Sequence, residues 1–174
     1  NFPGFGSTTT MENAVIDLLG EQKADLFFER YRSNYITEKD ISFLAESGFN
    51  ALRIPLHYKH FSPSFNEFTD IGFNLLEPII NACRDNDMYV VLDMHAAPGA
   101  QNTSDFSDSD EQEARLFTQY SNQKWYVSTW RYIAERYANE PEHINKDIKH
   151  PLKFSSRQFI AVICLRLRNE SAYK

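Results

Sequence analysis

Two basic side chains stand at or near the ends of two apolar segments. Arg53 alternates with Leu52 and Ile54 just before Pro55, and His95 directly follows a continuous apolar run. In α/β proteins, ligands bind where parallel strands end, because loops and helix N-termini converge at that edge. A guanidinium on an inner face needs an acceptor, and a catalytic carboxylate would supply one. Spacing alone leaves open whether Arg53 forms a structural salt bridge and whether His95 is a structural or a substrate-contacting residue.

Carboxylates occur near these positions as well. Asp93 lies two residues before His95, on the same side of a regular strand, and we predict that it is a buried partner for the backbone or an arginine. The acidic segment 105–111 lacks the ligand spacing of a calcium loop, which favours a solvated loop over a cation site. The sequence therefore predicts no metal site and no cofactor.

Aromatic residues make up 14% of the chain, and several of them follow the first apolar segment. Tyr58 and Phe61 in this loop, and Trp125 farther along, are candidates for stacking on a ligand. Packing in the core or in a lid is the alternative for the same residues.

The elements that would position these residues alternate in type. Residues 49–55 and 89–94 read as strands, the second buried on both faces, and helical periodicity occurs in residues 11–32 on both sides of a turn at Gly20, in residues 70–86 and around residues 127–137. This alternation predicts βαβ units with a parallel sheet.

A further helix is marked by its start and stop signals. Thr37 and Asp40 have the spacing of a capping box, and Ile36 can pack on Ile41 as a hydrophobic staple. Gly48 supplies the left-handed residue that ends such a helix.

Composition excludes several classes of protein. The net charge is −6, and no basic patch suggests binding to nucleic acid or to an anionic membrane. No apolar run is long enough to span a bilayer, and no signal peptide is recognisable. Cys83 and Cys164 form no metal or disulfide motif and are predicted to be buried thiols.

The composition changes near Pro141. Residues 1–141 have a net charge of −10 and residues 142–174 a net charge of +4. In the tail, only residues 159–165 look like a strand. We therefore expect two parts, a barrel segment in residues 1–141 and a divergent tail in residues 142–174, which we interpret as an out-of-frame or unspliced extension.

Residues 48–55 (GFNALRIP) and 90–102 (VVLDMHAAPGAQN) together resemble glycoside hydrolase family 5, the cellulase family. Similarity extends over about residues 11–141, and Ala96 departs from the glycine that usually follows the histidine. The resemblance implies a (β/α)8 barrel. Because a complete barrel has about 250 residues, the 174-residue chain is expected to hold about the first three to four βα units.

The resemblance also implies a retaining glycosidase that cleaves a β-linked glucan-type polysaccharide, without a cofactor or protein partner, and an extracellular location. Two glutamates about 5 Å apart do this chemistry in retaining enzymes. The family's second-strand arginine, which binds the nucleophile, corresponds to Arg53, and its third-strand histidine, which contacts the sugar, to His95. Asn102 belongs to the same substrate-binding loop.

The resemblance places the catalytic glutamates less directly. We interpret the Asn-Glu-Pro at residues 139–141 as a chance match because it directly follows a helix. Glu170, after the apolar run 159–165, is the better candidate for the acid/base. The nucleophile is expected beyond Lys174.

Two alternatives stay open. The chain could be a catalytically inactive half barrel that at most binds carbohydrate weakly, or a barrel that uses Arg53 and His95 on an anionic substrate. The match of the loop after His95 favours the glycosidase over the anionic-substrate reading.

Overall fold

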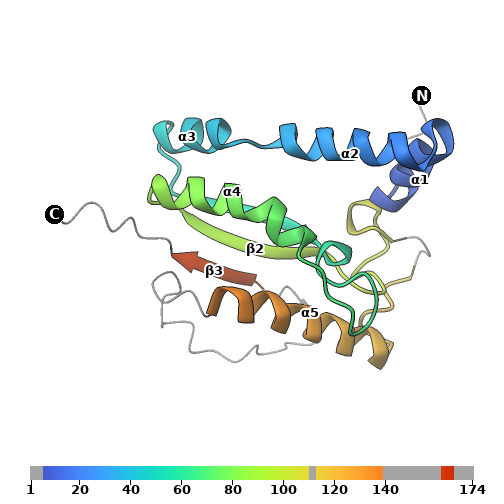
Figure 1. The fold of residues 1–174 in the computed structure, drawn as a ribbon. Helices are drawn as coiled ribbons and strands as arrows, with labels where there is room; N and C mark the ends of the chain where they lie inside the picture. The colour runs from blue at the N-terminus through green and yellow to red at the C-terminus, as the bar shows by residue number, and fades with distance from the viewer. Residues whose placement is uncertain (1–5, 110–112, 139–161, 167–174) are drawn as a thin grey trace.

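The computed structural model describes residues 6–109, 113–138 and 162–166 (Figure 1). Its helices are α1 (Thr8–Leu19), α2 (Glu21–Tyr35), α3 (Glu38–Glu46), α4 (Ile71–Asp85) and α5 (Tyr120–Ala138), with short 3-10 turns η1 (Tyr58–His60) and η2 (Asp105–Ser107). Its strands are β1 (Ala51–His57), β2 (Tyr89–Ala96) and β3 (Val162–Arg166), in the order β1-β2-β3.

The two strands that carry the predicted site residues are adjacent and parallel. Ala51 pairs with Tyr89 and Leu56 with Met94, and a register shift then sets His57 opposite Ala96. α4 connects the two strands, as the predicted βαβ unit requires. The parallel pairing is therefore confirmed, and both strands end at the same edge of the sheet.

The third strand differs from the expectation. β3 runs antiparallel to β2, with Val162 opposite Asp93 and Arg166 opposite Tyr89. Residues 162–165 of the predicted apolar run 159–165 lie in a strand, and residues 159–161 lie outside the described residues. This strand is not the parallel fourth strand of a barrel. The chain leaves β3 at the end of the sheet opposite to His95.

The core lies between one face of the sheet and the helices. Alternate side chains of β2 point into it, because successive residues of a strand face opposite sides. Helices α3, α4 and α5 supply the rest of this core, which includes Ile41, Phe73, Leu76, Ile80, Val90, Leu92, Met94, Trp130 and Ile133. Cys83 is also buried here, and burial raises the pKa of its thiol to about 11.

The first strand is longer than predicted at its carboxyl end. Pro55 was expected to close it, yet Pro55 lies within β1 and pairs with Asp93. A proline lacks the amide proton of a sheet ladder and is tolerated on an edge strand. β1 is such an edge in the described sheet.

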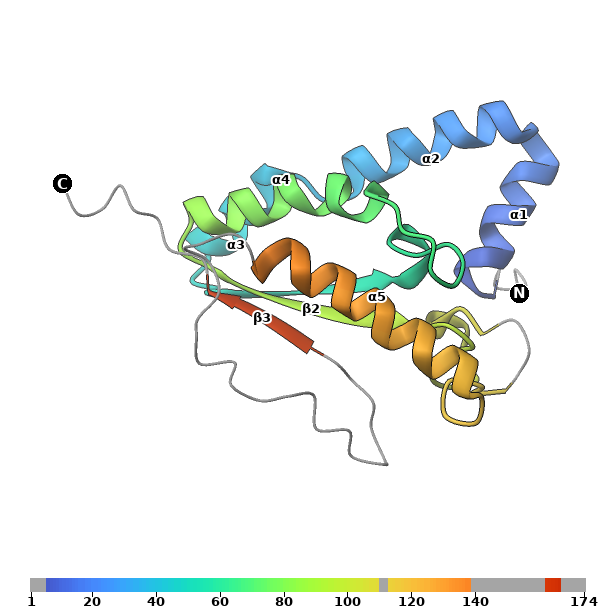
Figure 2. The ribbon, with the colours of Figure 1, turned by 60° about the horizontal axis from the view of Figure 1, so that its bottom comes forward.

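The N-terminal helices follow the predicted pattern. α1 and α2 meet at Gly20, where Figure 2 shows the chain bend, and in the view of Figure 1 α2 and α3 run nearly end to end above α4. The capping box of α3 is present, and the carboxylate of Asp40 accepts a hydrogen bond of 2.7 Å from the backbone N–H of Thr37. By contrast, α1 buries no residue and α2 buries only Ala24, so these two helices attach weakly to the core.

Within the described residues, no helix is both long and apolar enough to cross a bilayer.

Candidate functional site

Arg53, Asp93 and His95 meet on the face of the sheet opposite to the helices. The register of the parallel pair brings Arg53 of β1 beside the two residues of β2. Arg53 Nη2 donates to Asp93 Oδ2, and His95 Nδ1 lies 3.3 Å from the same oxygen. Arg53 Nη2 and His95 Nδ1 are 3.5 Å apart. We call these three residues the strand-end cluster.

The members of the strand-end cluster differ in their exposure. The side chain of Asp93 is 2% exposed, whereas those of Arg53 and His95 are 56% and 31% exposed. A buried carboxylate therefore anchors two basic groups that face solvent. This confirms the predicted role of Asp93 as a buried partner of an arginine, and the guanidinium keeps N–H donors directed outward for a ligand.

The contact with Asp93 also orients the imidazole. A carboxylate only accepts hydrogen bonds, so we assign the proton to His95 Nδ1, which leaves Nε2 available to an external donor. With this tautomer the 3.5 Å approach of Arg53 Nη2 to Nδ1 is not a hydrogen bond, and Asp93 is the acceptor for both groups. The ring of Phe106 stacks on His95 with centroids 5.5 Å apart. The ring is thus held on one edge and covered on one face.

Asn102, the third predicted substrate contact, has a local role in the structure. Its Oδ1 accepts a hydrogen bond of 2.8 Å from the backbone N–H of Ser104. This contact shapes the loop after β2. The structure brings Arg53 and His95 together, and it does not add Asn102 to their hydrogen-bonded group.

A second cluster surrounds Asp108, at the end of η2. Asp108 accepts hydrogen bonds from the backbone N–H of Thr9 (2.7 Å) and the Thr9 hydroxyl (2.6 Å). It also lies 2.8 Å from His57 Nε2 and 3.4 Å from Lys59 Nζ. The side chain of Asp108 is only 3% exposed. We call Thr9, His57, Lys59 and Asp108 the tether cluster because they tie α1 to both loops at the strand ends.

The electrostatics of the tether cluster keep its carboxylate ionised. Burial by itself would raise the pKa of Asp108, but hydrogen bonds from His57 and Thr9 outweigh burial and hold the pKa well below its usual range. His57 Nδ1 accepts a hydrogen bond from the backbone N–H of Lys59, so its Nε2 carries the proton given to Asp108. Every polar atom of this imidazole is therefore satisfied inside the protein.

His60 lies beside the tether cluster, with its ring centroid 5.8 Å from that of His57. Burial, together with the nearby charges of His57, Arg32 and Lys59, lowers the pKa of His60 to about 4. His60 is therefore neutral at physiological pH.

The loop after His95 makes a tight approach to α5. Gly99 has φ +74°, and a β-carbon there would lie 2.1 Å from the side-chain nitrogen Nδ2 of Asn122. Only glycine fits both the left-handed backbone and this contact. The Pro-Gly of the sequence motif thus sets the path of the loop that carries Phe106 and Asp108.

The predicted stacking residues serve packing. Phe61 is buried and meets Phe73 edge to face, so the packing alternative holds for Phe61. Tyr58 contacts Trp125 edge to face, and Trp125 Nε1 donates a hydrogen bond of 2.8 Å to Ser62 Oγ. These contacts hold the loop after β1 against α5.

The remaining predictions concern a cation site in the acidic segment 105–111 and the two glutamate candidates. Among the described residues, no three His, Cys, Asp or Glu side chains are grouped as metal ligands. Glu170 and residues 139–141 lie outside the described residues. β3 runs antiparallel to β2, so its carboxyl end lies at the edge of the sheet opposite to His95. Glu170 was chosen because it would follow a parallel fourth strand, and β3 is not such a strand.

Sequence reasoning missed the tether cluster. The signal was weak, because its members are spread from Thr9 to Asp108 and match no motif spacing. Asp108 adopts a left-handed conformation, with φ +53°. Aspartate tolerates that region better than most residues, and only the folded chain shows that it is needed there.

Known proteins are similar in sequence to the part of the chain that holds these elements. The Cellulase family model (glycosyl hydrolase family 5) matches residues 12–149. The chain is 35% identical over 121 residues to Endoglucanase C of Acetivibrio thermocellus, which covers 68% of this chain and 34% of that protein. It is 32% identical over 126 residues to a Beta-xylosidase of Phanerodontia chrysosporium, covering 71% of this chain and 26% of that protein.

A solved structure supports the fold. The rutinosidase from Aspergillus niger aligns with a TM-score of 0.59 at 20% identity, covering 68% of this chain and 34% of that one. At this identity the likeness shows the fold alone. The chain spans about a third or less of the length of these relatives, and its β1-α4-β2-α5 part is a partial α/β barrel.

Proposed function

The chain belongs to glycosyl hydrolase family 5, the cellulase family, and from this premise we propose that it is the N-terminal part of a retaining glycosidase that acts on β-linked glucans. The observation that carries the proposal is the strand-end cluster. Its two basic side chains share one buried carboxylate and face solvent, His95 one residue before the end of β2 and Arg53 within β1, reaching Asp93 toward the carboxyl edge of the parallel pair. This is the edge at which ligands bind in α/β barrels.

In this proposal, Arg53 holds a catalytic carboxylate of the assembled barrel. Its guanidinium has donors beyond the one given to Asp93, and a positive charge beside a carboxylate favours the ionised, nucleophilic form. Retention requires a second carboxyl group about 5 Å away as acid and base. Both catalytic glutamates are proposed to lie outside the described residues.

His95 is proposed to contact the sugar at the cleavage point. Because Nδ1 is engaged with Asp93, Nε2 is the ring nitrogen that can form a hydrogen bond with the ligand. Phe106, stacked on the imidazole, limits its rotation. Asn102 is proposed to act through the shape of the loop and not by touching substrate.

The domain division follows as a proposal too. Residues 1–141 form the barrel segment, and residues 142–174 are a divergent tail that does not continue the parallel barrel order. The antiparallel pairing of β3 supports this division. By itself the chain is proposed to bind saccharide without hydrolysing it.

A chimaera tests the function. The matched segment of this chain replaces the corresponding 121 residues of Endoglucanase C. We expect the chimaera to hydrolyse carboxymethylcellulose, with NMR of the first product anomer showing retention, and the unmodified 174-residue chain to show no turnover. Arg53→Ala in the chimaera should abolish activity without unfolding it. A folded chimaera with undiminished activity after this change would refute the role of Arg53.

A further inference from the structure

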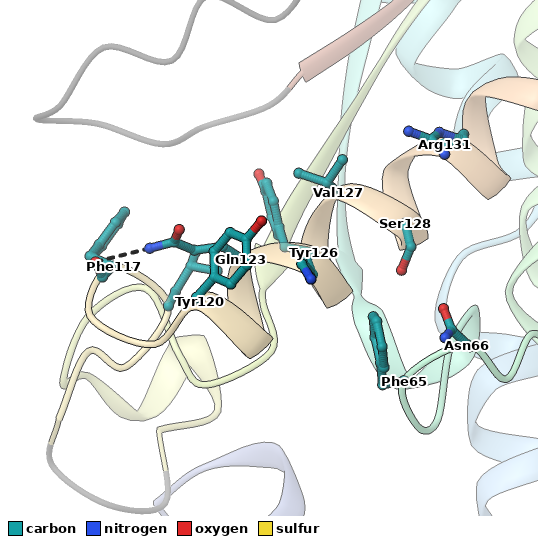
Figure 3. A pocket seen from close by; sticks show the side chains of 11 residues that line it. Phe65, Asn66, Phe117, Tyr120, Gln123, Tyr126, Val127, Ser128 and Arg131 are labelled. Atoms are coloured by element: carbon teal, nitrogen blue, oxygen red, sulfur yellow. Dashed lines mark hydrogen bonds between the residues drawn. The ribbon is translucent and has the colours of Figure 1, made fainter.

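A groove with a volume of about 490 Å³ lies along α5, outside the strand-end cluster (Figure 3). The loop after β1 contributes Phe65 and Asn66, the segment before α5 contributes Phe117, and α5 contributes Tyr120, Gln123 and Arg131. None of these residues belongs to the strand-end cluster or the tether cluster. The volume lies within the usual range for small-molecule sites, about 300–1,000 Å³.

Aromatic rings line this groove and stay accessible. Phe65 is 48% exposed, Phe117 41% and Tyr120 69%. Figure 3 shows Phe117 and Tyr120 near one end and Phe65 on the other side of the groove, across from α5. Flat exposed rings of this kind suit a ligand with apolar faces, since each stacked ring removes apolar surface from water on both partners.

Polar groups lie beside the rings of the groove and can supply hydrogen bonds to a ligand. Gln123 Nε2 donates a hydrogen bond of 3.0 Å to the carbonyl oxygen of Phe117, and Lys124 Nζ lies 4.5 Å from the ring centroid of Tyr120. The side chains of Asn66 and Arg131 border the same space. Apolar faces between hydrogen-bonding groups match a pyranose ring, whose C–H faces are apolar and whose hydroxyl groups lie at its edge.

We propose that this groove is a second saccharide-binding site, which takes several units of a neutral β-linked glucan by ring stacking. The choice of ligand class rests on the proposed function, whereas the location rests on the groove itself. The site starts at the N-terminal end of α5, the end that receives the loop from His95. A glucan bound there would be held by the protein independently of the strand-end cluster.

The experiment is a titration of the 174-residue chain with β-1,4- and β-1,3-linked glucan hexasaccharides, followed by NMR. The side-chain amide of Gln123 is the reporter because it lies in the groove wall. Tyr120→Ala should weaken the affinity by about tenfold, the effect of losing one good ring contact. Phe43→Ala is the matched control, because Phe43 is a similarly exposed aromatic on α3.

Arg53→Ala separates this site from the proposed active site. Binding followed at Gln123 that keeps its affinity in Arg53→Ala and is weakened about tenfold in Tyr120→Ala supports the groove. An affinity at Gln123 that Tyr120→Ala leaves unchanged, or that Phe43→Ala weakens equally, overturns it, and so does the absence of saccharide-induced shifts at Gln123. None of these three results bears on the chimaera assay, so failure of the groove and failure of the proposed function are distinguishable.

Discussion

Two clusters in this molecule have the same ingredients and different exposure. The strand-end cluster and the tether cluster each contain one buried aspartate, one histidine and one cationic side chain. In the tether cluster the imidazole turns inward, since the His57 side chain is 14% exposed and both its nitrogens have protein partners. Lys59 is 39% exposed, but its Nζ is engaged by Thr9 and Asp108. In the strand-end cluster Arg53 and His95 turn toward solvent.

The difference follows from position in the chain. Asp108 is reached by α1 and by the loop after β1, so packing closes over it from both sides. Asp93 lies on the sheet face that the described helices do not cover. The same combination of an aspartate, a histidine and a cationic side chain thus stabilises the fold in the tether cluster and is available to a ligand in the strand-end cluster. Four changes test this contrast.

Asp108→Ala should give the largest effect, a loss of about 3 kcal/mol in the free energy of unfolding. The change leaves the His57 and Thr9 donors buried without an acceptor and removes an ion-pair partner. Urea denaturation followed by circular dichroism measures it. Asp108→Asn, which keeps an acceptor and tolerates φ +53°, should lose less. Equal losses in Asp108→Ala and Asp93→Ala would break the contrast.

Acidification should lower the free energy of unfolding through His60, which lies beside the tether cluster. The folded pKa of His60 is about 4, against about 6.5 in an unfolded chain. The unfolded state therefore binds more protons between these values, so stability is full above about pH 6.5 and falls toward pH 4, by about 2 kcal/mol for a partly exposed group. Urea midpoints at pH 7 and 4.5 measure the change, and His60→Gln should flatten it. An unchanged slope in that variant would contradict the assignment.

Asp93→Asn should cost less stability, about 1 kcal/mol, because Arg53 and His95 can turn to water. Its larger consequence is functional. Without the carboxylate, both basic side chains lose their common anchor, and hydrolysis by the chimaera should fall by about a hundredfold. The measurement pairs urea denaturation with kcat and KM. A loss of stability as large as that of Asp108→Ala would show that Asp93 mainly stabilises the fold, as Asp108 does.

Phe106→Ala should give the smallest change in stability, under about 0.5 kcal/mol, because the ring is 66% exposed. Phe106 and Asp108 are only two residues apart yet serve different clusters. Removing the ring should free His95 and weaken saccharide binding at the strand ends by about threefold. Hexasaccharide titration with the His95 ring protons as reporter measures this. A large loss of stability would show that the clusters are not independent.

Local signals predicted the elements well. The capping box of α3 involves residues three apart, so its hydrogen bond was predictable from Thr37 and Asp40 alone. The parallel pairing of β1 and β2 followed from the alternation of strand and helix. The spacing of Asp93 and His95 predicted their shared face because side chains alternate along a strand.

Contacts between distant residues were harder to predict. Thr9 and Asp108 are 99 positions apart, and nothing in either local sequence specifies the partner. The direction of β3 depends on strand pairing, which its apolar composition does not encode. Phe61 and Phe65 occupy the same loop, but only packing decided that Phe61 is buried and Phe65 is accessible.

The sequence by itself determined the family, the two parallel strands and the residue types at their ends, because motifs and periodicity are local properties of the chain. The tertiary structure decided which charged groups are enclosed and which face a ligand. Burial depends on what packs around a side chain from distant parts of the chain. Asp93 and Asp108 are both buried, and the greater exposure of His95 than of His57 separates a candidate active site from a structural tether.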